Sequence, residues 1–328
     1  MRCIAAWLPG RNWQNTADAL ACFQDGNFGS HFRLSRLKIP NSSLMPDSIA
    51  VIIPIYNRCH TLGRALQSVY GQTLPPDEVC VVDDGSDDGS RDFVRQHFPQ
   101  ARYIYQPNAG VSAARNSGVQ ATQSHWLAFL DSDDEWLPNK LERQLEEAAL
   151  NPDCGFVHCD EIWIRNGRWV NPMNKHQKSG GEIFEQCLPR CVISPSAAVI
   201  TRALFEEMGG FDESFPACED YDLWLKICSR YPVLYLNQAL LKKYGGHEDQ
   251  LSGLHWGMDR FRVKALDNLL GSAKLSPGQY QATRRTLISK SEILVQGALK
   301  RNNTETAKRF QALINKYSDV ESAEQRDE

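Results

Sequence analysis

Four consecutive polar residues follow a short apolar run and suit the binding of a divalent metal ion. They are Asp131, Ser132, Asp133 and Asp134. Three carboxylates so close together repel one another unless a cation lies among them. Mg²⁺ and Mn²⁺ prefer oxygen ligands and typically take one or two carboxylates together with substrate phosphates. The cluster therefore predicts a metal site that also holds a diphosphate. The alternative is a solvated turn whose Asp side chains cap a helix beginning near Pro138.

A second acidic pair, Asp83 and Asp84, ends another apolar run and precedes a glycine. A carboxylate here can accept hydrogen bonds from a base N–H or a ribose hydroxyl, and the glycine allows a sharp turn. Further along, Asn108, Gly110 and Arg115 offer donors for phosphates or a sugar. The alternatives are a turn capped by an Asp side chain and, for Arg115, an ion pair with a surface carboxylate.

Two more carboxylates, Glu219 and Asp220, stand just before a helix expected over 221–230. Such residues can act as a general base that takes the proton from an acceptor hydroxyl. The alternative is a purely local role, because carboxylates at a helix start cap the helix or stabilise its dipole.

Apolar strands and amphipathic helices alternate over the part of the chain that carries the first two acidic clusters. The expected strands span 49–54, 78–82, 102–105 and 126–130, and the expected helices span 61–70, 90–98 and 111–121. This alternation predicts right-handed crossovers and an α/β fold with a mainly parallel, Rossmann-like sheet flanked by helices. In such sheets ligands bind beyond the carboxyl ends of the strands, which is where both clusters lie.

The rest of the chain is less regular. We expect a helix over 141–150, strands over 156–164, 197–201 and 233–236, and mostly helices from 256 to about 317. Residues 1–45 show no sustained period and are expected to form a poorly ordered extension. The expected organisation is therefore this extension, an α/β domain over 46–255, and a helical C-terminal region over 256–328 with a frayed tail. Basic residues in that region suit acceptor docking, a membrane surface or self-association, and simple coverage of the core is the alternative.

A chain beginning at Met45 is expected to keep its fold and its ligand binding, because residues 1–45 lack the periodicity of a packed element. The midpoint of thermal unfolding, measured on the full and the shortened chain, checks this expectation. A large fall in that midpoint, or loss of soluble protein, would show that the extension packs on the domain.

The bulk composition limits the class of protein. With 328 residues, of which 42% are hydrophobic and 23% charged, the chain suits a globular protein with a sizeable core. A net charge of −4 argues against a nucleic-acid partner. No apolar run of about 18 residues and no signal-peptide pattern occur, and the cysteines form no C-x-x-C pair. We therefore expect reduced thiols and a cytoplasmic location, either free or at the inner face of the membrane; the oligomeric state stays open.

From residue 49 to about 250 the sequence resembles the family 2 glycosyltransferases, which have the GT-A fold. The matching segments are V-I-I-P-I-Y-N-R at 51–58, V-D-D-G-S-D-D-G-S at 82–90, A-R-N at 114–116, F-L-D-S-D-D at 129–134, G-G-F-D-E at 209–213, E-D-Y-D-L-W at 219–224 and H-E-D-Q-L-S at 247–252. Each segment alone is unspecific, but their order and spacing are typical of the family. The resemblance covers more than half of the chain.

The resemblance implies roles for individual residues. The donor would be held by Pro54, Tyr56, Asn57, Arg58, Asp83, Asp84, Asn108, Gly110, Arg115, Asp131 and Ser132. Asp131 and Asp133 would bind Mn²⁺ or Mg²⁺, and His247 lies where the family often has a residue near the metal; the alternative is an exposed loop histidine. Asp220 would be the catalytic base, with Glu219 beside it. The two glycines before His247 depart from the bulkier residues of the family and suggest a mobile lid.

The activity implied by the resemblance is an inverting, metal-dependent transfer of a sugar. The donor would be a nucleotide sugar, expected to carry uridine, and the acceptor a hydroxyl of a saccharide or a lipid-linked saccharide, in polysaccharide or glycoconjugate synthesis. Two alternatives remain open. One is a non-catalytic module that binds nucleotide sugars, and the other is a nucleotidyltransferase, which would usually add a Gly-rich, basic loop near the first strand that this sequence lacks.

Overall fold

A computed structural model of the chain describes residues 48–171, 173–246, 255, 257–271 and 274–318. All of them lie in one unit, Met45–Glu328. The extension expected over residues 1–45, His247 and the tail after Ser318 lie outside the described residues, and the expectations about them stay predictions.

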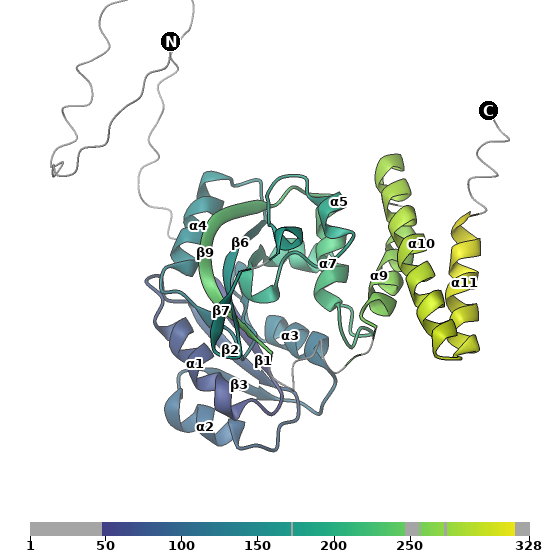
Figure 1. Cartoon of the computed structure of the whole chain (residues 1–328). Helices are drawn as coiled ribbons and strands as arrows, with labels where there is room; N and C mark the ends of the chain where they lie inside the picture. Colours follow the sequence, from purple (N-terminus) through teal and green to yellow (C-terminus); the bar gives the residue numbers. More distant parts are fainter. Residues whose placement is uncertain (1–47, 172, 247–254, 256, 272–273, 319–328) are drawn as a thin grey trace, which may run out of the picture. The chain divides into compact units, whose positions relative to one another are not determined.

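The first half of the described chain forms a parallel sheet with intervening helices, as the sequence predicts (Figure 1). Its elements are β1 (Ile49–Ile55), α1 (Cys59–Tyr70), β2 (Glu78–Asp83), α2 (Ser90–His97), β3 (Arg102–Tyr105), α3 (Val111–Gln120) and β4 (Trp126–Phe129). The strands pair in the order β3-β2-β1-β4, all in parallel. All these elements end within two residues of the expected positions, because each is marked by a continuous apolar run or a clear helical period.

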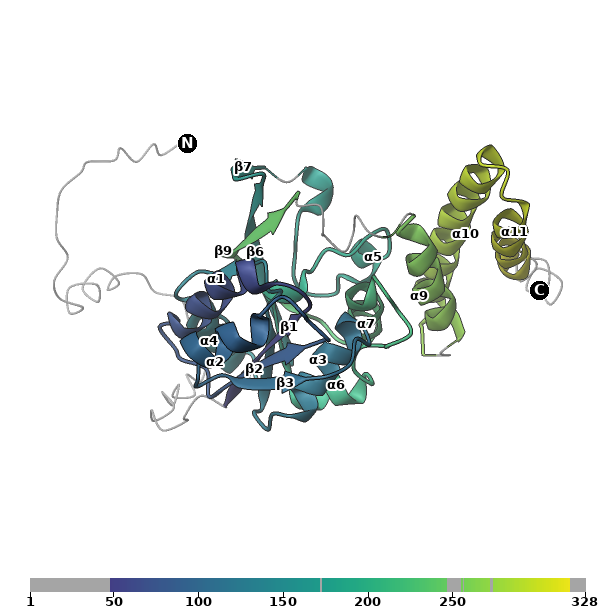
Figure 2. The ribbon, with the colours of Figure 1, turned by 90° about the horizontal axis from the view of Figure 1, so that it is seen from below.

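The central strand β1 is buried at every position and separates two layers of core. Ile49 and Val51 belong to one buried cluster, which includes residues of α1 and α4 (Lys140–Leu150). Ala50 and Ile52 belong to the other, together with Val119 of α3. Helices therefore cover both faces of the sheet (Figure 2).

The second half of the sheet is mixed rather than parallel. Its elements are β5 (Glu135–Trp136), β6 (Phe156–Arg165), β7 (Arg168–Val170), α5 (Phe184–Cys187), β8 (Ala198–Thr201), α6 (Arg202–Glu207), α7 (Glu219–Cys228) and β9 (Leu234–Gly245), with short 3₁₀ turns at Asn174–His176 and Pro195–Ala197. β8 runs antiparallel between β4 and β6, whereas β9 runs parallel to β6 and antiparallel to β5.

Two expected boundaries in this half were wrong. The strand expected to end at Leu236 continues as β9 to Gly245, so Gly245 is the last residue of a strand. The pairing of β6 with β9 shifts register on either side of Asp160, and such irregularities break the period-2 pattern that marks a strand in the sequence. The helix expected from Tyr221 begins instead at Glu219, and this matters for the site described below.

Three helices end the described chain: α9 (Asp259–Gly271), α10 (Pro277–Lys300) and α11 (Thr304–Ser318). A capping box at Ser276 and Gln279 starts α10. Leu266, Leu287 and Phe310 share one buried cluster with Trp224 of α7, which favours the interpretation that these helices cover the core. Among the described residues, none of the helices has the length and apolar character needed to cross a membrane.

Candidate active site

One large cavity, of about 1020 Å³, opens at the carboxyl ends of β1, β2 and β4. Its lining includes most of the residues singled out in the sequence, namely Pro54, Tyr56, Asn57, Arg58, Asp84, Asn108, Gly110, Arg115, Asp131, Ser132, Asp133, Glu219 and Asp220. Asp83 is described but is not among the lining residues, and His247 lies outside the described residues. The fold therefore brings segments more than 160 residues apart to one edge of the sheet.

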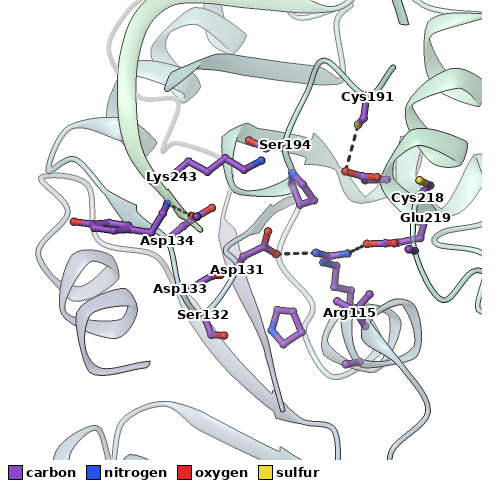
Figure 3. A pocket seen from close by; sticks show the side chains of 18 of the residues that line it. Arg115, Asp131, Ser132, Asp133, Asp134, Cys191, Ser194, Cys218, Glu219 and Lys243 are labelled. Carbon is purple, nitrogen blue, oxygen red and sulfur yellow. Dashed lines mark hydrogen bonds and ion pairs between the residues drawn. The ribbon is translucent and has the colours of Figure 1, made fainter. Parts of the chain in front are cut away.

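Arg115 joins the two acidic segments at the centre of this cavity (Figure 3). Its side chain is only 3% exposed. One Nη donates to Asp131 Oδ1 at 2.7 Å and the other donates to Glu219 Oε1 at 2.5 Å. Although burial by itself favours the neutral guanidinium, the two carboxylates raise the pKa of Arg115, so that it stays a cation. Arg115 thus forms an ion pair, as the alternative held, but its guanidinium is buried in the cavity wall and contacts two candidate site residues instead of a carboxylate at the surface.

The three carboxylates of the Asp131–Asp134 cluster all line the cavity, but they differ in burial: Asp131 and Asp133 are partly exposed, whereas Asp134 is buried. Asp134 is buried and accepts hydrogen bonds from Ser196 Oγ at 2.7 Å and from the backbone N–H of Tyr244 at 3.0 Å. Burial, followed by repulsion from Asp133 and Asp131, raises its pKa well above the usual range. Helix α4 takes Asn139 as its N-cap without a side-chain cap, so the capping alternative for this cluster is wrong.

The carboxylate oxygens of this cluster decide whether it can bind a metal ion. Within the described ranges, no three His, Cys, Asp or Glu side chains converge on a point that could hold a metal. Mg²⁺ typically uses one or two carboxylates and completes its coordination with substrate phosphates and water, so three protein ligands are not required. Asp131 and Asp133 line the same cavity and supply oxygen ligands of that kind.

Asp83 and Asp84 are both buried but do different things. The Asp84 carboxylate accepts hydrogen bonds from the backbone N–H groups of Ala109 at 2.9 Å and Gly110 at 2.8 Å. It thus shapes the loop that precedes α3. The Asp83 carboxylate accepts hydrogen bonds from the Tyr103 hydroxyl and, at 2.7 Å, from the backbone N–H of Ser86. Asp84 therefore lines the cavity, whereas Asp83 does not line it and instead binds Tyr103 and the backbone of Ser86.

Glu219 and Asp220 are the first two residues of α7, and their side chains diverge. Glu219 is buried against Arg115, and burial raises its pKa despite that cation. Asp220 lies in the cavity wall, where the Cys191 thiol donates to its Oδ2 at 3.3 Å and the backbone N–H of Tyr221 lies 2.7 Å from its Oδ1. The helix begins after Cys218, which has a positive φ of 66°. That turn directs two successive carboxylates to different partners.

Several residues that line the cavity were not predicted from the sequence. Cys191 contacts Asp220, and Lys243 of β9 lines the cavity between the two acidic segments. Burial alone would lower the pKa of Lys243, but the carboxylates of Glu161, Asp134 and others raise it, so it stays protonated. Glu161 forms a buried ion pair with Lys178 at 2.9 Å, which holds the pKa of Glu161 at about 2 despite burial. These pairs join residues distant in sequence, so no local motif marks them.

Comparison with known proteins places the chain in a family. The sequence model of Glycosyl transferase family 2 matches residues 50–209, and that of Glycosyltransferase like family 2 matches residues 183–262. UDP-Glc:alpha-D-GlcNAc-diphosphoundecaprenol beta-1,3-glucosyltransferase WfgD of Escherichia coli is 33% identical over 208 residues, which are 62% of this chain and 79% of that protein. The chain spans between 30% and 65% of the length of five uncharacterized Rickettsia glycosyltransferases that it matches at 29–30% identity.

Solved structures show the same fold at lower identity. Residues 1–349 of S. aureus TarS in complex with UDP-GlcNAc align with a TM-score of 0.54 at 16% identity, covering 83% of this chain and 92% of that one. Mannosyltransferase PcManGT of Pyrobaculum calidifontis in complex with GDP-Man and Mn²⁺ aligns with a TM-score of 0.54 at 18% identity, covering 83% and 84%. The chain belongs to glycosyl transferase family 2 and has the GT-A fold.

Proposed function

We propose that the protein is an inverting glycosyltransferase that moves a sugar from a nucleotide-sugar donor to an acceptor hydroxyl. One observation carries the proposal: Asp131 and Asp133 on one side, and Glu219 and Asp220 on the other, line a single cavity of about 1020 Å³. Arg115 joins the two sides through its ion pairs with Asp131 and Glu219. That volume suits a nucleotide sugar, whose phosphates would lie near the first pair of carboxylates. Its reacting sugar would then lie toward the second pair.

Asp220 is the proposed general base. It takes the proton from the acceptor hydroxyl, and the oxygen attacks the anomeric carbon from the face opposite to the leaving nucleoside diphosphate. The bond from that carbon to the phosphate oxygen breaks as the new bond forms, so the configuration inverts. Glu219 is paired with Arg115 and buried, which makes it unsuited to the same role and favours Asp220.

Arg115 is proposed to position the machinery rather than to react. Because its guanidinium binds Asp131 and Glu219 at once, it fixes the distance between the donor side and the base side of the cavity. A bound Mn²⁺ or Mg²⁺, held by Asp133 and Asp131, would neutralise charge that develops on the leaving diphosphate. His247 is proposed to lie near this metal ion; it is outside the residues that the structure describes, so this role stays a prediction.

The substrate class follows by analogy with the relatives. WfgD is named for a UDP-glucose donor and a diphosphoundecaprenol-linked acceptor, and the TarS structure holds UDP-GlcNAc. We infer a uridine nucleotide sugar as donor and a saccharide or lipid-linked saccharide as acceptor, in the synthesis of a polysaccharide or glycoconjugate. We also propose that residues 46–255 form the catalytic domain and that the cytoplasm is its location. PcManGT was solved with GDP-Man, so the test must include guanosine donors.

The experiment that tests the proposal is donor turnover in the absence of an acceptor. The full chain is incubated with a panel of UDP- and GDP-sugars, and release of the nucleoside diphosphate is followed with Mn²⁺, with Mg²⁺ and with EDTA. We expect slow, metal-dependent hydrolysis of at least one donor, with water as acceptor. Binding of a donor without any turnover, either in water or with saccharide acceptors added, would favour the non-catalytic alternative.

Asp133→Asn is expected to weaken metal and donor binding together by at least about tenfold, since even outer-shell changes at metal sites cost that much. Calorimetric titration with UDP, in Mn²⁺ and in EDTA, measures both effects. Asp87→Asn is the matched control, because Asp87 lies in the family motif but is exposed and outside the cavity lining. Equally tight UDP binding by the unchanged protein in EDTA would contradict the metal assignment.

A further inference from the structure

The hairpin formed by the end of β6 and by β7 exposes large apolar side chains. Trp169 is 73% exposed and Met173, just after β7, is 59% exposed. Cross-strand pairing places Trp169 opposite Ile164, so the two share one face of the hairpin. Figure 2 shows β7 at the outer end of β6. A single exposed apolar side chain would be ordinary, but Ile164, Trp169 and Met173 lie in one short stretch of chain, and such grouping indicates an interaction surface.

The charged side chains of this hairpin and of the segment that follows it are all basic. Residues 162–181 contain Arg165, Arg168, Lys175 and Lys178 and no Asp or Glu, in a chain whose net charge is −4. Lys178 is buried with Glu161, which leaves the first three exposed. No ion pair joins any of these three to another described residue. A fourth cation, Arg190, donates to the carbonyl of Lys175 at 3.0 Å and thus lies at the same place.

We propose that this hairpin tip, of which residues 164–171 and 173–175 are described, docks on the surface of an anionic lipid bilayer. Tryptophan is the side chain that best occupies the boundary between headgroups and acyl chains, and methionine adapts to it. Long cationic side chains extend to lipid phosphates. Arg165 and Arg168 pair across the strands on the face opposite to Trp169, so the bilayer would be contacted by the end of the hairpin, where both faces meet. A protein partner would need a larger surface than one short hairpin provides. The acidic net charge of the chain argues against nucleic acid.

The tip is continuous with the cavity. Trp163, Ile164, Arg165 and His176 belong to the hairpin and to the cavity lining, and the Trp163 and His176 rings lie 5.0 Å apart. A bilayer that binds the tip therefore lies at the rim of the cavity, on the β6 side. This gives a lipid-linked acceptor a short path to Asp220, a consequence that rests on the proposed function. The binding itself does not depend on it.

The test is binding of the full chain to vesicles of phosphatidylcholine alone and of equal parts phosphatidylcholine and phosphatidylglycerol, measured by co-sedimentation. We expect binding to the anionic vesicles at low salt. Arg168→Gln should reduce it by roughly fivefold, the effect of one cation near such a surface. Trp169→Ser should reduce it by roughly tenfold or more, because the side chain buries a large apolar area. Neither residue lines the cavity, so donor turnover without lipid should stay unchanged.

Leu150→Ser is the matched control, since Leu150 is 78% exposed but lies at the end of α4, outside the hairpin. It should leave vesicle binding unchanged, and the melting temperatures of all three variants should match that of the unchanged protein. Equal binding to both kinds of vesicle, no binding to either, or the same loss in Leu150→Ser as in Trp169→Ser would overturn the proposal. Because the assay needs no sugar transfer, failed vesicle binding with normal donor turnover leaves the proposed activity intact.

Discussion

Asp220→Asn is expected to lower turnover by roughly 10²–10⁴-fold, the range typical of the loss of a general base. The change keeps the size of the side chain and one hydrogen-bonding oxygen but removes the basicity. Donor affinity should change little, because the Asp220 carboxylate bonds to Cys191 and to the start of α7 and has no direct contact with the Asp131–Asp134 cluster. Steady-state turnover, donor binding and melting temperature are measured on the same preparation.

A matched control separates chemistry from helix stability. Asp222 stands in the same first turn of α7, pairs with Lys226 and is not among the cavity-lining residues. Asp222→Asn removes a carboxylate from that turn and should spare turnover per folded molecule. If Asp220→Asn behaves in this way too, Asp220 stabilises the start of the helix and is not the base.

Arg115→Met is expected to destabilise the fold by about 3–5 kcal/mol, since removing one partner of a buried ion pair leaves uncompensated charge. Glu219 is buried and Asp131 is partly buried, and Arg115 is the cation that contacts both. Denaturant unfolding, with its midpoint and slope, measures the free energy. Arg115→Lys should recover part of the loss only, because an ammonium lacks the planar fork that bridges two carboxylates.

A second substitution tests whether the destabilisation by Arg115→Met comes from its ion pair with Glu219. Adding Glu219→Gln to Arg115→Met removes a buried charge that the first change leaves unpaired. The double variant should therefore be more stable than Arg115→Met alone. Equal stability of Arg115→Met and the unchanged protein would show that the pair contributes nothing, and its proposed positioning role would fail with it.

The parallel half of the sheet could be predicted because its strands are buried on both faces. β1 is apolar from Ile49 to Ile55 and packs in two layers, so the run is continuous and ends at a turn. The acidic residues that follow β2 and β4 then had to lie at one edge, as parallel strands end there. β9 was mostly missed because its pairing with β6 shifts register along its length, and polar Asn237 and Gln238 interrupt its apolar pattern.

The hydrogen-bond and ion-pair partners of the site residues could not be predicted from the sequence. Arg115 and Glu219 are 104 residues apart, and nothing near either one marks the other. Asp83 and Asp84 are adjacent and chemically identical, so only the fold tells which one borders the cavity. The thiol of Cys191 reaches Asp220 from a loop without motif character. Residue types and order thus predicted which side chains gather, whereas packing decides what each of them touches.

The stereochemistry of donor cleavage tests the central claim most directly. The full chain is incubated with an α-linked nucleotide sugar and Mn²⁺, and the anomeric proton of the released sugar is followed by NMR before mutarotation. Attack by water activated at Asp220, from the face opposite to the diphosphate, predicts that the β-anomer appears first and that EDTA and Asp220→Asn abolish it. First appearance of the α-anomer, or unchanged release by Asp220→Asn, would contradict the account.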